Sequence, residues 1–252
     1  MNVRLYSMPG SHAATTGELL FQQKGIAYKR TDLLPVVSWV VLKALRFPGV
    51  TVPAAKINGE RVQGTREIAR ALEARQPEPP LYPEDAERRR AVEEAERFGD
   101  EVLQQRVREI FLWSARKDRS GLVGYLEGSK IGMPHRLAAM TAGPFIALDA
   151  RSRGATDENV RAAIAALPEL LQRVDDWIAE GVLGGEQLNA ADLQIAPSLR
   201  LAMSLDDLRP AFEGRPAEHL ATRVVKHFPG RTPPVLPPEW LVDFRPARSS
   251  LS

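Results

Sequence analysis

The first residues that could do chemistry in this 252-residue chain lie around Pro53 and Thr65. Pro53 stands between apolar residues at the start of a predicted strand, where a proline often follows a cis peptide bond. Twelve residues later, Gly64 and Thr65 lead into a helix predicted over residues 66–75. Thr65 is the predicted N-cap, and the free N–H groups of a helix N-terminus can bind an anion. The segment therefore predicts an anion-binding helix start close to a rigid proline.

The position of this helix start depends on the strands and helices predicted around it. Residues 56–62 read as a hairpin with Asn58-Gly59 as its turn. Before it, the pattern predicts a strand over 3–7, a helix over 15–24 and a strand over 26–33. Segment 36–45 fits either a strand or a helix, and its place between a strand and the proline turn favours a helix. The resulting order, β-α-β-α-β-β-α, is that of a thioredoxin-like domain.

A second region of the chain reads as helical. Four prolines within residues 76–83 make a stiff connector, which we place at 76–85 between a first domain of 1–75 and a helical domain of 86–228. Apolar residues at helical spacing predict one long or kinked helix over 84–117 and another over 134–151. A third helix begins at Thr156, and residues 229–252 form a Pro-rich tail in which Trp240, Leu241 and Phe244 suggest docking on the body or on a partner.

A helix start near the C-terminal end carries a distinct capping signal. Asn189 is the predicted N-cap, and Asp192 is placed to reach back to it, as in a capping box with Asp in place of Glu. We read this motif as structural.

Composition excludes several classes of function. The chain has no cysteine, which excludes disulfides, thiolate metal sites and cysteine nucleophiles. Its 34 basic and 32 acidic residues nearly balance, and the densest basic run, 88–90, is flanked by glutamates, so we expect no nucleic-acid partner. The four histidines lack metal-ligand spacing, and we expect no metal. No apolar run is long enough for a bilayer and no secretory leader opens the chain, so we expect a cytoplasmic protein without a membrane partner.

Three features together resemble the glutathione transferase family. These are the proline, hairpin and hydroxyl-bearing helix start; the opening strand and loop of residues 3–12; and segment 188–197, which is similar to a capping motif of the family's helical domain. The resemblance covers most of the chain and implies a thioredoxin-like α/β N-terminal domain followed by an all-α helical-bundle domain. It also implies a detoxification enzyme that transfers glutathione, as co-substrate, to a small-molecule electrophile, and a homodimer.

The resemblance assigns a thiol-activating role to the loop that begins at Pro9. Members of the family hold the tripeptide and stabilise its thiolate with a hydrogen-bond donor at the start of the first helix. Ser11 is the first candidate for that donor. His12 stands where several bacterial members have a cysteine and is the second candidate; Tyr6 and Ser7 are further alternatives.

The resemblance also implies residues that bind the rest of the tripeptide. Val52, beside Pro53, would offer its backbone N–H and C=O to the cysteinyl part. Thr65 would bind the γ-glutamyl carboxylate. The family usually has Glu or Gln directly before this hydroxyl, to meet the glutamyl amine. This sequence departs from that pattern, because it has Gly64 there and Gln63 one residue earlier.

The electrophile is expected between the Pro9 loop and the long helix, with the tail as a further candidate wall. On that helix we take Trp113 as a substrate-binding residue and expect Phe111 in the core and Arg108 at the surface. Two alternatives stay open. The chain could be a non-catalytic ligand- or protein-binding module of the same fold, or an isomerase or dehalogenase. Redox chemistry through an enzyme mixed disulfide is excluded without a cysteine.

Overall fold

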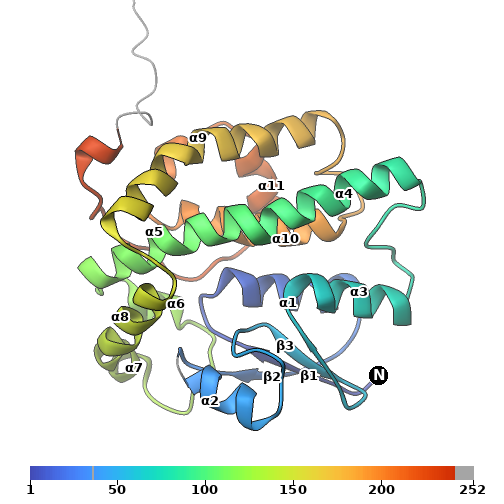
Figure 1. Cartoon of the computed structure of the whole chain (residues 1–252), viewed down its shortest axis with the longest axis horizontal. Coiled ribbons are helices and arrows are strands. Elements are labelled where there is room, and N and C mark those ends of the chain that lie inside the picture. Colours follow the sequence, from blue (N-terminus) through green and yellow to red (C-terminus); the bar gives the residue numbers. More distant parts are fainter. Residues whose placement is uncertain (36, 242–252) are drawn as a thin grey trace, which may run out of the picture.

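The computed structural model describes residues 1–35 and 37–241. The chain forms a sheet-containing N-terminal domain that is followed by a helical domain (Figure 1). The order β-α-β-α-β-β-α is confirmed. The N-terminal elements are β1 (Val3–Ser7), α1 (His12–Gln23), β2 (Lys29–Asp32), α2 (Val37–Ala44), β3 (Ala54–Ile57), β4 (Glu60–Gln63) and α3 (Thr65–Arg75). Within segment 36–45, residues 37–44 are thus helical, and α1 begins three residues earlier than the apolar pattern indicates.

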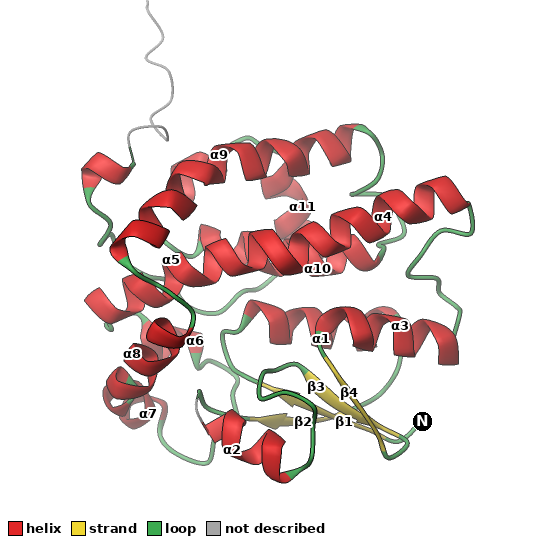
Figure 2. Cartoon of the chain, in the orientation of Figure 1, coloured by secondary structure: helices red, strands yellow, loops and turns green. Residues whose placement is uncertain are grey.

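The sheet has the order β2-β1-β3-β4, with β1 parallel to β2 and antiparallel to β3. Side chains of a strand alternate between faces. Leu5 points into the core shared with α1 and α3, whereas its neighbour Tyr6 packs in a separate cluster with Leu42 of α2 and with Phe47. Helices therefore cover both faces, and α1 and α3 lie between the sheet and the helical domain (Figure 2).

The proline hairpin forms as predicted, but the helix after it starts differently. The Val52–Pro53 bond is cis, and Asn58 and Gly59 take positive φ angles in the turn between β3 and β4. Thr65 is the first helical residue and not the N-cap. Gly64 occupies the N-cap position at φ 101° and ψ 149°, a backbone conformation that essentially only glycine adopts. The prediction of Thr65 as N-cap was wrong because the local pattern does not reveal this backbone conformation.

The helical domain contains several long helices, which pack side by side (Figure 1). Helix α4 (Ala86–Phe98) continues through a π-helical turn, Gly99–Leu103, into α5 (Gln104–Lys117), which confirms one long helix with an interruption. The others are α6 (Leu122–Tyr125), α7 (His135–Thr141), α8 (Gly143–Ser152), α9 (Asp157–Ala179), α10 (Ala190–Met203) and α11 (Pro216–Val224).

The single helix expected over 134–151 is in fact two helices. Helix α7 ends at Thr141 and α8 begins at Gly143, with Pro144 in its first turn. Proline has no N–H to donate to the preceding turn and favours the first turn of a new helix. The prediction overlooked this proline because apolar residues continue at helical spacing across the break.

Helix α10 is the centre of the molecule and begins with the predicted capping box. Asn189 accepts hydrogen bonds from the N–H groups of Ala191 and Asp192, and the carboxylate of Asp192 accepts from Asn189 N–H. Nearly all residues of α10 are buried, and it packs against α1, α4, α5 and α11. The tail docks on the body through Trp240, whose ring centroid lies 5.2 Å from that of Trp113. Phe244, also expected to dock, lies outside the described residues.

Buried polar groups tie the connector to both domains. Lys24, at the end of α1, is 1% exposed, and its ammonium donates to the carbonyl oxygens of Gln76, Pro77 and Pro79 and to Glu73. Around the connector, Glu96 of α4 accepts hydrogen bonds from Tyr82 and from Arg70 of α3, at 2.8 and 3.0 Å. Within residues 1–35 and 37–241, none of the helices combines the length and apolar character needed to cross a bilayer.

Lys24 supplies a test of this interdomain anchor. We expect Lys24→Ala to lower the free energy of unfolding by about 3 kcal/mol or more, because it leaves Glu73 and the connector carbonyls without their donor. Urea denaturation would measure the change. Lys43→Ala, at an exposed position of α2, is the control and should change stability by about 0.5 kcal/mol at most. Equal effects of both variants would contradict the anchor.

Candidate functional site

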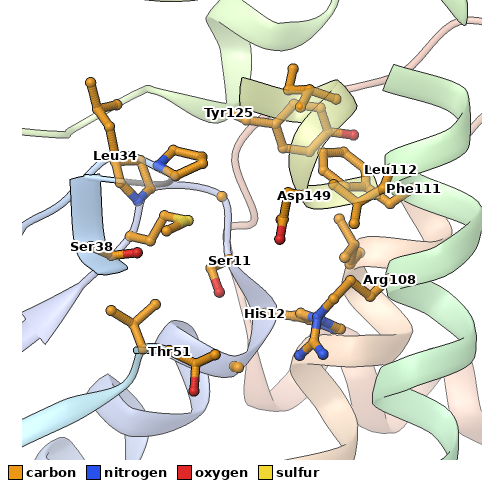
Figure 3. Close-up of a pocket in the computed structure, with 18 of the residues that line it drawn as sticks. Ser11, His12, Leu34, Ser38, Thr51, Arg108, Phe111, Leu112, Tyr125 and Asp149 are labelled. Carbon is orange, nitrogen blue, oxygen red and sulfur yellow. The ribbon is translucent and has the colours of Figure 1, made fainter. Parts of the chain in front are cut away.

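A cavity of about 340 Å³ lies between the two domains and collects most of the residues that the sequence singled out. The N-terminal domain contributes the Pro9 loop, the start of α1, the segment before β3 and the start of α3. The helical domain contributes the π-helical turn, α5, α6, α7 and α8. Figure 3 shows Ser11 and Thr51 on one side and Arg108 and Phe111 on the other. Pro9, Ser11, His12, Val52, Pro53, Gly64 and Thr65 all line it.

Ser11 is held at the N-terminus of α1 with its hydroxyl beside the cavity. As N-cap, its Oγ accepts a hydrogen bond from Ala14 N–H at 3.3 Å. The hydroxyl hydrogen takes no part in that bond, so it can be donated to a ligand. The positive end of the α1 dipole lies at the same place and favours an anion there. Ser11 thus has the position and the proton that a thiolate-stabilising donor requires.

His12 also lines the cavity, but it is a buried residue tied to α10. Its Nδ1 lies 3.1 Å from Ser198 Oγ, and its Nε2 has no hydrogen-bond partner among the described residues. Burial, reinforced by the positive charges of Arg108 and Arg153, lowers the pKa of His12 well below its ordinary value. The imidazole is therefore neutral near pH 7 and cannot attract a thiolate by its charge.

The segment before β3 presents an unpaired backbone to the cavity. Neither the N–H nor the C=O of Val52 has a hydrogen-bond partner within residues 1–35 and 37–241. Gly17 lets α1 approach this segment, because a Cβ there would lie 2.7 Å from Pro53 Cβ. Gln63 does not line the cavity. Its amide is used to hold the segment, accepting from Gly49 N–H and donating to Thr51 C=O, both at 2.6 Å.

The start of α3 is the anion-ready helix N-terminus that the sequence predicted, with two carboxylates close by. Thr65 Oγ1 lies 3.5 Å from Asp100 Oδ1, and Asp100 lines the cavity from the π-helical turn. Burial raises the pKa of Asp100, with nearby Arg66 opposing the shift. A Cβ at Gly64 would collide with the carboxylate of Glu67. Acidic groups therefore surround the place where the missing Glu or Gln side chain would begin.

The helical wall differs most from expectation. Arg108, expected at the surface, reaches into the cavity, and Phe111 lines it with its ring centroid 5.0 Å from that of Tyr125. Asp149 and Arg153 enter from α8, and the tail contributes no lining residue within the described part of the chain. Asp100, Asp149 and Arg153 were missed, because their approach depends on tertiary packing and no local pattern marks it.

Trp113, taken as a substrate-binding residue, does not line the cavity. Its indole is buried, donates to Asp157 Oδ1 at 2.7 Å and packs against Trp240. Two alternative donors also lie elsewhere: Tyr6 packs on Phe47, and Ser7 donates to Glu18 at 2.6 Å. Among the described residues, no group of three His, Cys, Asp or Glu side chains is arranged to hold a metal ion.

Comparison with known proteins agrees with this architecture. Residues 5–80 match the family model described as Glutathione S-transferase, N-terminal domain. A search of curated proteins found no match for this chain. Many solved structures do match it, among them a glutathione S-transferase from Rhodospirillum rubrum F11, 20% identical, with 89% of this chain and 88% of that chain covered and a TM-score of 0.56.

Two further solved structures are also similar to this chain. A maleylacetoacetate isomerase from Anaeromyxobacter dehalogenans 2CP-1, with GSH bound in its active site, is 19% identical, with 88% of this chain and 89% of that chain covered and a TM-score of 0.53. Glutathione transferase F7 from Populus trichocarpa is 11% identical, with 89% and 94% covered and a TM-score of 0.60. Residues 5–80 thus match the N-terminal domain of glutathione S-transferases, and the chain has the glutathione transferase fold. These identities establish the fold and not the reaction.

The buried state of His12 has a consequence for stability. The unfolded chain binds a proton at this imidazole below its ordinary pKa of 6.5, whereas the folded chain keeps it neutral. Stability is therefore intact above that pH and is lost as the pH falls, by at most about 1.4 kcal/mol per pH unit. We expect His12→Asn to remove this contribution when urea denaturation is compared between about pH 7 and about pH 5. His219→Asn, exposed on α11, is the control; equal slopes for wild type and His12→Asn would disprove the assignment.

Proposed function

We propose that this protein is a glutathione transferase-like enzyme that transfers the thiol of glutathione to an electrophilic small molecule. One observation carries the proposal: Ser11, the unpaired backbone of Val52 and the start of α3 at Thr65 line the same cavity. A tripeptide thiol needs these three features, a thiolate donor, a strand-like backbone partner and a carboxylate site. Neighbours of the same fold have been crystallised with GSH or glutathione sulfonate, which supports glutathione as the co-substrate.

In this proposal Ser11 donates its hydroxyl hydrogen to the thiol sulfur and stabilises the thiolate. The N–H groups at the start of α1 add a positive field, which lowers the pKa of the bound thiol. The neutral His12 lies behind Ser11 and holds α1 on α10 through Ser198. Its part in the reaction is therefore to position the helix start. The binding site lowers the barrier mainly by bringing thiolate and electrophile together.

The tripeptide would lie across the N-terminal wall. Val52 exchanges backbone hydrogen bonds with the cysteinyl residue, as an added strand does. Thr65 and the free N–H groups of α3 hold the γ-glutamyl carboxylate. Gly64 has no side chain that could bind the glutamyl ammonium, and Asp100 binds this group instead. The Asp100 carboxylate lies beside Thr65, and its burial, which raises its pKa, makes a cationic partner favourable.

The chemical step is a displacement or an addition by the thiolate. With an aryl chloride, the sulfur forms a bond to the ring carbon, the carbon–chlorine bond breaks, and chloride leaves with the bonding electrons. The thiol proton has by then passed to solvent. The helical wall, with Phe111, Leu112 and Ile146, offers an apolar surface for the electrophile. With a different electrophile the same thiolate could serve an isomerase, the activity named for one of the structural neighbours.

The second candidate is a non-catalytic binding module of the same fold, which the glycine at position 64 favours. The homodimer and the cytoplasmic location stay predictions drawn from the resemblance and the sequence. Light scattering on the purified protein would measure the oligomeric state.

Ser11→Ala separates the enzyme from the binding module. If Ser11 stabilises the thiolate, we expect kcat/KM with glutathione and an activated aryl chloride to fall on the order of 10²-fold, as when one oxyanion donor is removed. The ultraviolet absorbance of bound thiolate, followed against pH, should show a raised thiol pKa. Thr222→Ala, exposed on α11, is the control for loss of a hydroxyl. A wild type that binds glutathione but turns over no electrophile would leave the binding module as the function.

Asp100→Asn tests the glutamyl site. Loss of a charge-assisted hydrogen bond should raise the Kd for glutathione about tenfold or more in calorimetric titration. A glutathione analogue without the α-amino group should bind wild type and variant alike, since it lacks the group that Asp100 meets. Glu101→Gln changes the adjacent, exposed carboxylate and is the control. Equal losses for both ligands would assign Asp100 to folding rather than to the ammonium.

A further inference from the structure

The electrophile side of the cavity contains a cation without a bonded partner. Arg108 reaches into the cavity from α5, and within residues 1–35 and 37–241 its guanidinium makes no side-chain hydrogen bond or ion pair. Figure 3 shows it beside His12, with Asp149 on the same side of the cavity. Buried polar groups nearly always have a hydrogen-bond partner. Arg108 is half-buried and faces the cavity, where a bound anion would supply that partner.

The charged groups that face Arg108 do not neutralise it. Asp149 lies 3.5 Å from Arg153 Nε and is shared with that second cation. Asp100 is engaged with Thr65 and Gln104 at the start of α3. Among the described residues, the other titratable groups at this wall are the neutral His12 and Tyr125, whose pKa burial raises. Glu109, on the same helix as Arg108, is paired with Arg106. Arg108 and Arg153 thus both line the cavity, and Asp149 is paired with Arg153.

The effect of this arrangement is visible in the protonation of Arg108. Burial, with the positive charge of Arg153 as the next cause, lowers its pKa to about 10, although Asp149 and Asp100 oppose the shift. The guanidinium still carries its full charge near pH 7. A charge in these surroundings is costly without a counter-ion, and an anion placed against it recovers part of that cost.

The surroundings define the shape of the missing partner. Phe111, Leu112, Ile146 and Ala139 give the wall an apolar surface next to Arg108. A guanidinium binds a carboxylate through two parallel N–H···O bonds, and it can bind a phosphate in the same way. The occupant is therefore expected to have an apolar body with an acidic end.

We propose that the electrophile of this protein carries a carboxylate, which Arg108 binds with support from Arg153. The inference rests on the proposed transfer of glutathione and narrows its substrate class. The apolar body lies against Phe111, and the carboxylate lies on the α5 and α8 side, opposite the thiolate at Ser11. Arg108 is then a specificity-determining residue that touches the substrate.

Two product analogues test the proposal by calorimetric titration. S-benzylglutathione and S-(4-carboxybenzyl)glutathione share the tripeptide and the ring and differ only in the carboxylate. We expect wild type to bind the carboxylated conjugate about tenfold or more tightly than the neutral one. Arg108→Gln should reduce the ratio of the two Kd values to about 1, and Arg108→Lys should retain part of it, since a point charge replaces the fork. Arg106→Gln, on the outer side of α5 and paired with Glu109, is the matched control and should keep the wild-type ratio.

The outcomes distinguish this inference from the proposed function. If wild type binds both conjugates equally, the carboxylate site is wrong while the glutathione site stands. If it binds neither, the proposed function fails and the inference fails with it. A preference that survives in Arg108→Gln with a native circular dichroism spectrum would also overturn the assignment to Arg108. The comparison within wild type does not depend on whether any variant folds.

Discussion

The position of α1 between the sheet and the buried helix α10 is the constraint on which the cavity depends. Three contacts hold this helix along its length. His12 meets Ser198 at its start, Gly17 admits Pro53 at its middle, and Lys24 binds the connector at its end. Since Ser11 caps the same helix, any shift of α1 would move the hydroxyl relative to Val52. The tight packing of protein interiors makes such a helix a rigid reference for the groups at its N-terminus.

This constraint also explains why polar groups are buried where the domains meet. A buried lysine or glutamate is stable only when several partners surround it. Lys24 satisfies the carbonyls of a connector that is too rich in proline to satisfy them by regular structure, and Glu96 collects Tyr82 and Arg70. Such contacts need a definite geometry, so they orient the helical domain against the sheet more specifically than apolar packing alone. The orientation of the two domains therefore determines the shape of the cavity between them.

A feature could be predicted from the sequence when the residues that cause it lie close together in the chain. The hairpin at Asn58, the capping box at Asn189 and the helix start at Thr156 were predicted correctly because their causes lie within four residues. The N-cap at Gly64 and the break at Pro144 were missed because apolar spacing conceals backbone conformation. Gln63 could not be placed, because its amide bonds to a segment more than ten residues away. The site residues of the N-terminal wall remain predictions that the geometry supports.

The cavity lining contributed by α5 and α8 could not be predicted from the sequence, for a further physical reason. On a helix with charged and apolar residues on several sides, the face turned inward depends on its neighbours and not on its own pattern. Arg108 and Trp113 are five positions apart on α5, and the structure places the arginine at the cavity and the tryptophan against Trp240 and Asp157. An exposed arginine and a ligand-contacting tryptophan are the ordinary expectations for these residue types. The structure reverses both expectations and places the charge of Arg108 in an otherwise apolar wall. A wall of that kind selects its ligand by charge as well as by size.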